Sequence, residues 1–275
     1  MKKNLVHKLK AIALPMLTVS IALGIIVPSA AKTADSVATQ LQTAIDGSWR
    51  TAENRARDPY RHPLQTLSFF AIKPNATVIE LFPSGKAYYS EILAPFLKDQ
   101  GQYIAVNVSD DPEDAGQKEK FSADPLHYGK IKVLTITPPV IEFGAENSAD
   151  FFLTFRNVHN FAMKGAEADL FKAIYKVLKP GGVLGIVDHR AKPDKTLDEV
   201  KNSGYIPEAL VIAAAEKAGF KLVAHSDVNN NSKDTKDHVH GVWSLPPTLY
   251  GGDKDREKYL AIGESDRFTL RFIKP

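Results

Sequence analysis

The stretch Leu178–His189, which reads Leu-Lys-Pro-Gly-Gly-Val-Leu-Gly-Ile-Val-Asp-His, decides the fold of this chain. Pro180 is expected to stop the helix before it, and Gly181 and Gly182 allow the positive φ of a tight reversal. The apolar run 183–187 then reads as a buried strand. A helix that turns directly into a buried strand indicates a crossover helix returning to a parallel sheet.

Apolar runs of strand length recur on both sides of this corner, separated by segments of helix length. The alternation predicts βαβ units and a largely parallel sheet in an α/β fold. Helices are expected over about Tyr88–Leu97, Ala166–Leu178 and Pro207–Ala218. The expected strands are Thr77–Leu81, Gln102–Val106, Lys132–Thr135, Asp150–Phe155, Val183–Asp188, Phe220–His225 and Phe268–Ile273.

Residues 1–31 read as an export signal. Four lysines stand in the first ten residues, residues 11–27 are almost entirely apolar, and the small residues that follow suit cleavage after Ala31. The alternative is a retained anchor, but the apolar run is just short of a full bilayer span and contains Pro15. The sequence therefore predicts a periplasmic protein with no stable membrane insertion after cleavage.

Composition narrows the function classes. The first 31 residues hold four lysines and no acidic residue, so the remainder carries a formal net charge of −1 against +3 for all 275 residues. The apparent basicity belongs to the signal and does not argue for nucleic-acid binding. The absence of cysteine excludes a disulfide scaffold, a thiolate metal site and a cysteine nucleophile.

Three further parts follow the signal. Residues 32–74 form a predicted N-terminal helical segment, and residues 75–275 form the α/β domain. Within it, residues 229–267 interrupt the alternation as a long insertion. Such a loop is usually functional or disordered, and its aromatic and proline content argues against disorder. We expect the insertion to pack back as a lid or a substrate wall.

A candidate ligand loop follows the first strand. Glu80 stands near its end, and Pro83, Ser84, Gly85 and Lys86 come next. Ligands of open parallel sheets bind beyond the carboxyl ends of the strands. A glycine-containing turn admits a ligand close to the backbone, and the N-terminus of the next helix favours an anionic group. A merely structural turn is the alternative.

Longer motifs resemble the exported "predicted methyltransferase" family of Gram-negative bacteria, within the class I S-adenosylmethionine-dependent methyltransferases. The resemblance implies a Rossmann-like, mostly parallel seven-stranded sheet with helices on both faces and an antiparallel final strand. It covers nearly the whole chain after the signal. The matching stretches are Arg61–Pro63, Val78–Leu81 with Pro83 and Gly85, Tyr89–Pro95, Arg156–Asn160, Gly241–Trp243, Pro246–Thr248 and Gly263–Arg267.

The resemblance implies S-adenosylmethionine as cofactor, with Glu80 and Gly85 lining its site. Two departures from the family pattern bear on this. Ser84 and Lys86 stand where glycines are expected, and Lys86 either pairs with the cofactor carboxylate or crowds the site. The second strand leads to Asn107 instead of the usual acid that holds the ribose, with Asp110 as a possible substitute.

The candidate catalytic residues follow the fourth and fifth strands. By the resemblance, the loop with Arg156, Asn157 and His159 faces the methyl group and the substrate. His159 is the candidate general base, and Arg156 would hold an anionic substrate. Asp188 would contact substrate or orient His159. In the structural alternative, Arg156 pairs with Asp188, Asn157 caps a helix, and Asp188 is only a hydrogen-bonded strand end.

No metal site is predicted. His238 and His240 share a face if extended, but no His-x-x-x-His helix accompanies them. The sequence also lacks Gly-x-Gly-x-x-Gly after the first strand and any Gly-x-Ser-x-Gly, which disfavours a dinucleotide oxidoreductase and a nucleophile-elbow hydrolase.

The leading hypothesis is a methyltransferase acting on a small-molecule substrate in the cell envelope. The alternative is a catalytically degenerate protein of the same fold that binds a small ligand, because the sequence shows no route by which cofactor would reach an exported enzyme.

Overall fold

The structure, a computed structural model, describes residues 29–109 and 112–275. Nearly all of the predicted signal and Asp110 therefore lie outside the described residues. The predicted cleavage point after Ala31 falls in the first turn of helix α1 (Ser29–Ile45). Among the described residues, no helix has the length and apolarity needed to cross a membrane.

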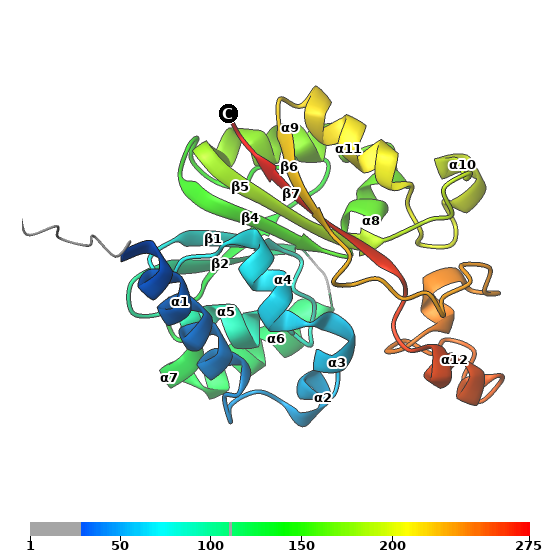
Figure 1. Cartoon of the computed structure of the whole chain (residues 1–275), viewed down its shortest axis with the longest axis horizontal. Coiled ribbons are helices and arrows are strands. Elements are labelled where there is room, and N and C mark those ends of the chain that lie inside the picture. The colour runs from blue at the N-terminus through cyan, green and yellow to red at the C-terminus, as the bar shows by residue number, and fades with distance from the viewer. Residues whose placement is uncertain (1–28, 110–111) are drawn as a thin grey trace, which may run out of the picture.

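Seven strands form a single sheet in the order β3-β2-β1-β4-β5-β7-β6 (Figure 1). Only β7 runs against its neighbours, pairing antiparallel with β5 and with β6. The predicted seven-stranded, mostly parallel sheet with an antiparallel final strand is thus confirmed. The strands are β1 (Thr77–Leu81), β2 (Gln102–Val108), β3 (Lys132–Ile136), β4 (Ala149–Phe155), β5 (Leu178–His189), β6 (Lys221–Ser226) and β7 (Arg267–Ile273).

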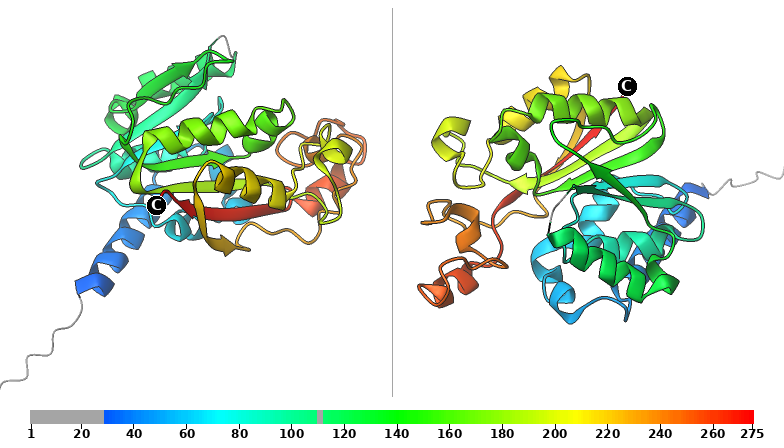
Figure 2. Two further views of the ribbon diagram at one scale, coloured as in Figure 1. Left: turned by 90° about the horizontal axis from the view of Figure 1, so that it is seen from above. Right: turned by 180° about the vertical axis from the view of Figure 1, so that it is seen from behind.

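Helices cover both faces of the sheet (Figures 1 and 2). One apolar core lies under α1, α4 (Pro63–Phe70), α5 (Ser90–Leu97) and α6 (Glu113–Ala123). The other lies under α8 (Val158–Ala162), α9 (Glu167–Val177) and α11 (Glu208–Lys217). The remaining helices are short: α2 (Ala52–Arg55), α3 (Asp58–Arg61), α7 (Pro125–Tyr128), α10 (Leu197–Val200), α12 (Arg256–Ile262) and the 3-10 turn η1 (Gly241–Ser244).

The corner after α9 differs from the prediction. The helix ends at Val177, before Pro180, and Leu178 is already extended with φ −71° and ψ 139°. The backbone N–H groups of residues 147 and 148 bind the carbonyl oxygens of residues 176 and 177, so the start of β4 ends the helix. Residues 179–182 bulge out of β5 before pairing resumes at Val183, and only Gly181 has a positive φ, of 79°.

Gly185 lies in the middle of β5, where there is no room for a side chain. A Cβ there would approach Leu153 Cδ2 to 2.8 Å and Phe70 Cδ1 to 2.9 Å. Gly185→Val is therefore expected to lower the free energy of unfolding in urea by about 1–3 kcal/mol through overpacking. Gly116→Ala is the control, because its Cβ would meet nothing within 4 Å. An unchanged Gly185→Val midpoint would contradict this packing.

The insertion 229–267, drawn orange to red, lies beyond the edge of the sheet at which β4 and β5 end (Figure 1). Its two ends meet where the Arg267 N–H donates to the Asn229 carbonyl oxygen at 3.1 Å. Its middle is held to the domain by the buried Asp234 carboxylate, which accepts the Tyr205 hydroxyl at 2.8 Å. The insertion is thereby placed against the carboxyl ends of the central strands.

Candidate active site

A cavity of about 650 Å³ opens at the carboxyl ends of β1, β4 and β5. This is the edge of an open α/β sheet at which ligands bind, and the volume suits a small molecule. Its wall combines the loop after β1, the loop after β4, the end of β5, the insertion and one N-terminal arginine. The lining residues are Arg57, Ser84, Gly85, Lys86, Arg156, His159, Asn160, His189, Val242, Trp243, Pro246, Pro247, Thr248, Glu264 and Ser265.

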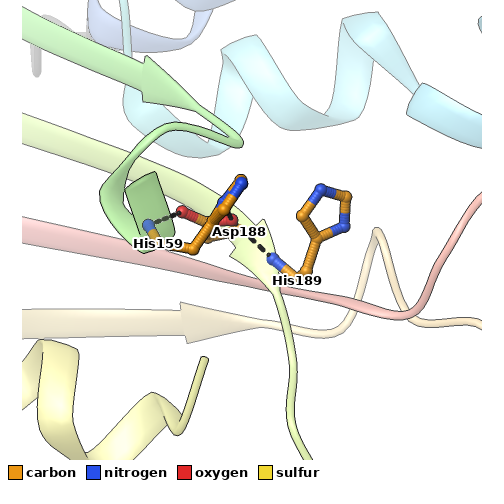
Figure 3. Close-up of side chains that lie close together, drawn as sticks. All are labelled: His159, Asp188 and His189. Atoms are coloured by element: carbon orange, nitrogen blue, oxygen red, sulfur yellow. Dashed lines mark hydrogen bonds and ion pairs between the residues drawn. The ribbon is translucent and has the colours of Figure 1, made fainter. Parts of the chain in front are cut away.

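His159 and Asp188 form a hydrogen-bonded pair beside this cavity (Figure 3). Asp188 Oδ1 lies 2.8 Å from His159 Nδ1 and also accepts the backbone N–H of His189 at 2.8 Å. Asp188 Oδ2 accepts the backbone N–H of His159 at 3.1 Å. A carboxylate that faces Nδ1 keeps the proton on that nitrogen, which leaves His159 Nε2 as the acceptor. The pair therefore has the orientation that a general base requires.

His189 completes this group without joining the pair. Its ring centroid lies 5.1 Å from that of His159, and its Nδ1 lies 2.5 Å from Ser265 Oγ. Burial, followed by the charges of His159 and Arg156, holds the pKa of His189 well below its usual range. His159, Asp188 and His189 have ligand atoms within 4.8 Å of one another, the only such group among the described residues. The Nδ1 atoms of His159 and His189 both contact protein groups. That this group binds no metal remains our prediction.

Three arginines converge on the buried carboxylate of Glu264 in the wall of the cavity. Arg57 Nε lies 2.8 Å from Oε1, Arg61 Nε lies 3.2 Å from Oε2, and Arg267 Nη1 lies 2.9 Å from Oε2. Burial alone would raise the pKa of Glu264, but the charges of Arg61, Arg267 and Arg57 outweigh it and hold the pKa below its ordinary range. This ion cluster ties the segment before β1 to the start of β7.

Arg156 stands at the cavity without a partner. Within the described residues its side chain makes no hydrogen bond or ion pair, and its Nε is buried and unsatisfied. The predicted structural pairing with Asp188 does not occur, because His159 and His189 occupy that carboxylate. Burial and then the charge of Arg61 lower the pKa of Arg156 well below its usual range. Its backbone is also left-handed, with φ 63°, a conformation that costs energy for a residue with a Cβ.

No family model matches the chain, and no curated protein matches it. Several solved structures are similar to it. A SAM-dependent methyltransferase from Aquifex aeolicus has 18% identity and a TM-score of 0.55, covering 86% of this chain and 98% of its own. The CcbJ methyltransferase from Streptomyces caelestis has 12% identity and a TM-score of 0.51, covering 83% and 99%. The cyclase SpnF has 16% identity and a TM-score of 0.56, covering 87% and 93%. The chain has the class I methyltransferase fold.

Identities this low support the fold alone, so the narrower resemblance to an exported family stays a prediction. In this methyltransferase fold the loop after β1 has an unusual backbone. Phe82 and Ser84 have φ of 46° and 64°, in the region that glycine favours. Asn157 Nδ2 donates to the carbonyl oxygens of Leu81 at 2.9 Å and Phe82 at 3.3 Å. Asn157 therefore holds the loop in place; it neither lines the cavity nor caps α8 with its side chain.

Lys86 does not stand ready for a cofactor carboxylate. Its ammonium pairs with Glu53 on the surface, and its carbonyl oxygen accepts Asn54 Nδ2 at 2.8 Å. The side chain is half-exposed, at 49%. The predicted crowding of the site is reduced because the side chain extends toward the N-terminal segment. Ser84, Gly85 and Lys86 line the methyltransferase-fold cavity, whereas Pro83 does not.

Glu80 and Asn107 also lie outside the cavity lining. Glu80 is buried and accepts the Tyr103 hydroxyl at 2.6 Å. Asn107 donates from Nδ2 to Gln117 Oε1 at 2.8 Å, and its Oδ1 is buried without a partner. Asn107 thus keeps one free acceptor at the end of β2, and Asp110, its predicted substitute, lies outside the described residues.

Glu80 should make stability depend on pH. Burial raises its pKa from 4.5 to about 7, against the opposing effects of the Tyr103 hydroxyl and Arg61. Between these values the folded chain keeps a proton that the unfolded chain releases, so the free energy of unfolding falls as pH rises through this window. The expected loss is about 3 kcal/mol, at 1.36 kcal/mol per pKa unit.

Urea unfolding at pH 5 and pH 8 measures this loss as the difference between the wild type and Glu80→Gln, because the low pKa of His189 adds an opposite pH dependence to both. Glu80→Gln should remove most of it, whereas Glu119→Gln, on an exposed position of α6, should retain it. Equal pH dependence in the wild type and Glu80→Gln would show that Glu80 ionises normally.

Sequence reasoning missed Arg57, which lines the cavity from the segment before β1. The charged segment 55–63 contains it, but no local pattern tells a cavity arginine from a surface one. Trp243 belongs to the insertion that was expected to form a lid or a substrate wall, and it lines the cavity. The prolines that follow it, Pro246 and Pro247, had signalled an ordered insertion and also line the cavity.

Proposed function

We propose that the protein is an S-adenosylmethionine-dependent methyltransferase that acts on a small-molecule acceptor bound in this cavity. One observation carries the proposal. The loop after β1 and the His159–Asp188 pair, which come from different strands, line or adjoin the same cavity at the carboxyl edge of a class I methyltransferase sheet. This arrangement supports the proposal, because a candidate cofactor loop and a candidate proton acceptor border one open cavity.

The residues present are compatible with the cofactor. Ser84 and Gly85 line the cavity, and Ser84 has a left-handed φ of 64°, the backbone conformation that glycine adopts readily. The unpartnered Asn107 Oδ1 at the end of β2 can accept a ribose hydroxyl. When bound, S-adenosylmethionine would supply an electrophilic methyl group on a sulfonium.

The protein groups would orient the acceptor and remove its proton. His159 Nε2 would accept the proton that the acceptor oxygen or nitrogen loses on methylation. Asp188 fixes the ring through Nδ1 and stabilises the positive charge that the ring acquires. Trp243 and Pro246 would contribute apolar surface to the wall against which the acceptor binds.

We place this activity in the cell envelope because of the predicted export signal in residues 1–31. The same signal supports a second candidate, a ligand-binding protein without methyl transfer. Ser84 and Lys86 stand where glycines are expected in the loop, and the cyclase SpnF has the same fold. In that case the cavity would still bind a small molecule.

Calorimetric titration with S-adenosylmethionine tests the first candidate. We expect a dissociation constant on the order of micromolar. Ser84→Val should weaken it by about tenfold, because a β-branched residue tolerates positive φ poorly. Ser122→Val, on an exposed position of α6, is the control. If folded protein binds no cofactor at millimolar concentration, the methyltransferase proposal fails and the ligand-binding candidate replaces it.

A further inference from the structure

The side chains in and behind the cavity wall carry more positive charge than negative charge. Arg57, Arg61 and Arg267 share one carboxylate, that of Glu264, and Arg156 interacts with it only at longer range. All of these side chains except Arg156 are at least nine-tenths buried. Buried charges are normally matched by partners, so this group has an excess of guanidinium over carboxylate.

The excess appears as unused hydrogen-bond donors. Arg57 Nη2, Arg61 Nη2, Arg267 Nε and Arg156 Nε are each buried with no acceptor among the described residues. A buried donor without an acceptor costs about 1–3 kcal/mol, and more when the group is charged. Arg57 and Arg156 both line the cavity, so an acceptor bound there would lie beside these two guanidinium groups.

Neighbouring acidic groups are otherwise engaged. Asp58 pairs with Arg50 and accepts the Tyr88 hydroxyl. Asp188 accepts three N–H donors from His159 and His189. Among the described residues, Glu264 is the only carboxylate in an ion pair with Arg57 or Arg61, so a ligand would have to supply the missing negative charge.

We propose that the methyl acceptor carries an oxyanion, a phosphate or a carboxylate, which binds between Arg57 and Arg156. This inference rests on the proposed function, because it assigns the bound anion to the methyl acceptor. Guanidinium groups bind such oxyanions through paired N–H donors. The cofactor has a net positive charge because of its sulfonium and ammonium groups, so an anionic acceptor also relieves its repulsion from the arginines.

Calorimetry with inorganic phosphate tests the site, at constant ionic strength and with and without saturating S-adenosylmethionine. Phosphate should bind the whole protein in both conditions. Arg156→Gln and Arg57→Gln should each weaken binding by at least about tenfold. Arg55→Gln, on the exposed α2, should leave it unchanged. Acetate in a parallel titration separates the two oxyanions: the tighter ligand identifies the class of acceptor.

Two results would overturn the inference. One is equal phosphate affinity in the wild type and Arg156→Gln, both shown to be folded by circular dichroism. The other is competition between phosphate and S-adenosylmethionine, which would assign the arginines to the cofactor carboxylate. A failure of the proposed function gives a different result from a failure of this inference. If S-adenosylmethionine does not bind but phosphate still depends on Arg156, an anion site persists on a ligand-binding protein and only its role in methyl transfer is lost.

Discussion

Replacing His159 with glutamine is expected to lower the rate of methyl transfer by about 10²–10⁴-fold, the usual contribution of a positioned general base. Glutamine cannot take up the acceptor proton that Nε2 would receive. Cofactor affinity should change little, because the variant alters a proton acceptor and leaves the loop after β1 intact. The rate is measured as transfer of labelled methyl from S-adenosylmethionine to a panel of small phosphates and carboxylates.

Asp188→Asn tests the role of the second residue of the His159–Asp188 pair. An amide can still bond the ring but no longer fixes the proton on Nδ1, so the rate should fall and the pH dependence of transfer should shift. His225→Gln, on an exposed position of β6, is the matched control. Transfer at the wild-type rate in His159→Gln, with cofactor bound, would assign the proton to another group or to solvent.

Replacing Glu264 with glutamine is expected to cost about 3–5 kcal/mol of unfolding free energy, because removing one partner of a buried ion pair leaves the others uncompensated. Here the loss leaves Arg57, Arg61 and Arg267 facing one another without a carboxylate. Urea unfolding at neutral pH measures the change.

Glu257→Gln is the control for this substitution, because Glu257 is exposed on α12. Added phosphate should restore part of the stability of Glu264→Gln, since binding to the folded state alone stabilises it. A loss below about 1 kcal/mol would place the arginines in a solvated, weakly coupled arrangement typical of surface pairs.

The strands were predictable because each is a short apolar run between turn residues. Six of the seven expected strands begin within one residue of their observed starts, and β5 begins at Leu178 instead of Val183. That difference arises because backbone pairing with Ala149, a tertiary contact, starts the strand before the Pro-Gly-Gly bulge. No pattern local to the corner encodes that partner.

The site was less accessible to sequence reasoning. The sequence correctly predicted that His159 and Asp188 lie close together, because the parallel strands β4 and β5 end at the same edge of the sheet. The roles expected for Asn157 and Lys86 depended on rotamers, and those rotamers follow contacts with Phe82 and Glu53. The arginine group unites residues 203 and 207 positions apart, a separation beyond the range of motif analysis.

The position of β7 affects the order in which the sheet can fold during synthesis. The last strand in the chain lies between β5 and β6, so both keep an unpaired edge until residue 267 and those after it have emerged. Pairings between distant segments form slowly, and open strand edges invite association with other chains. During synthesis this half of the sheet, and with it the Glu264 ion cluster, therefore forms only after β7 has emerged.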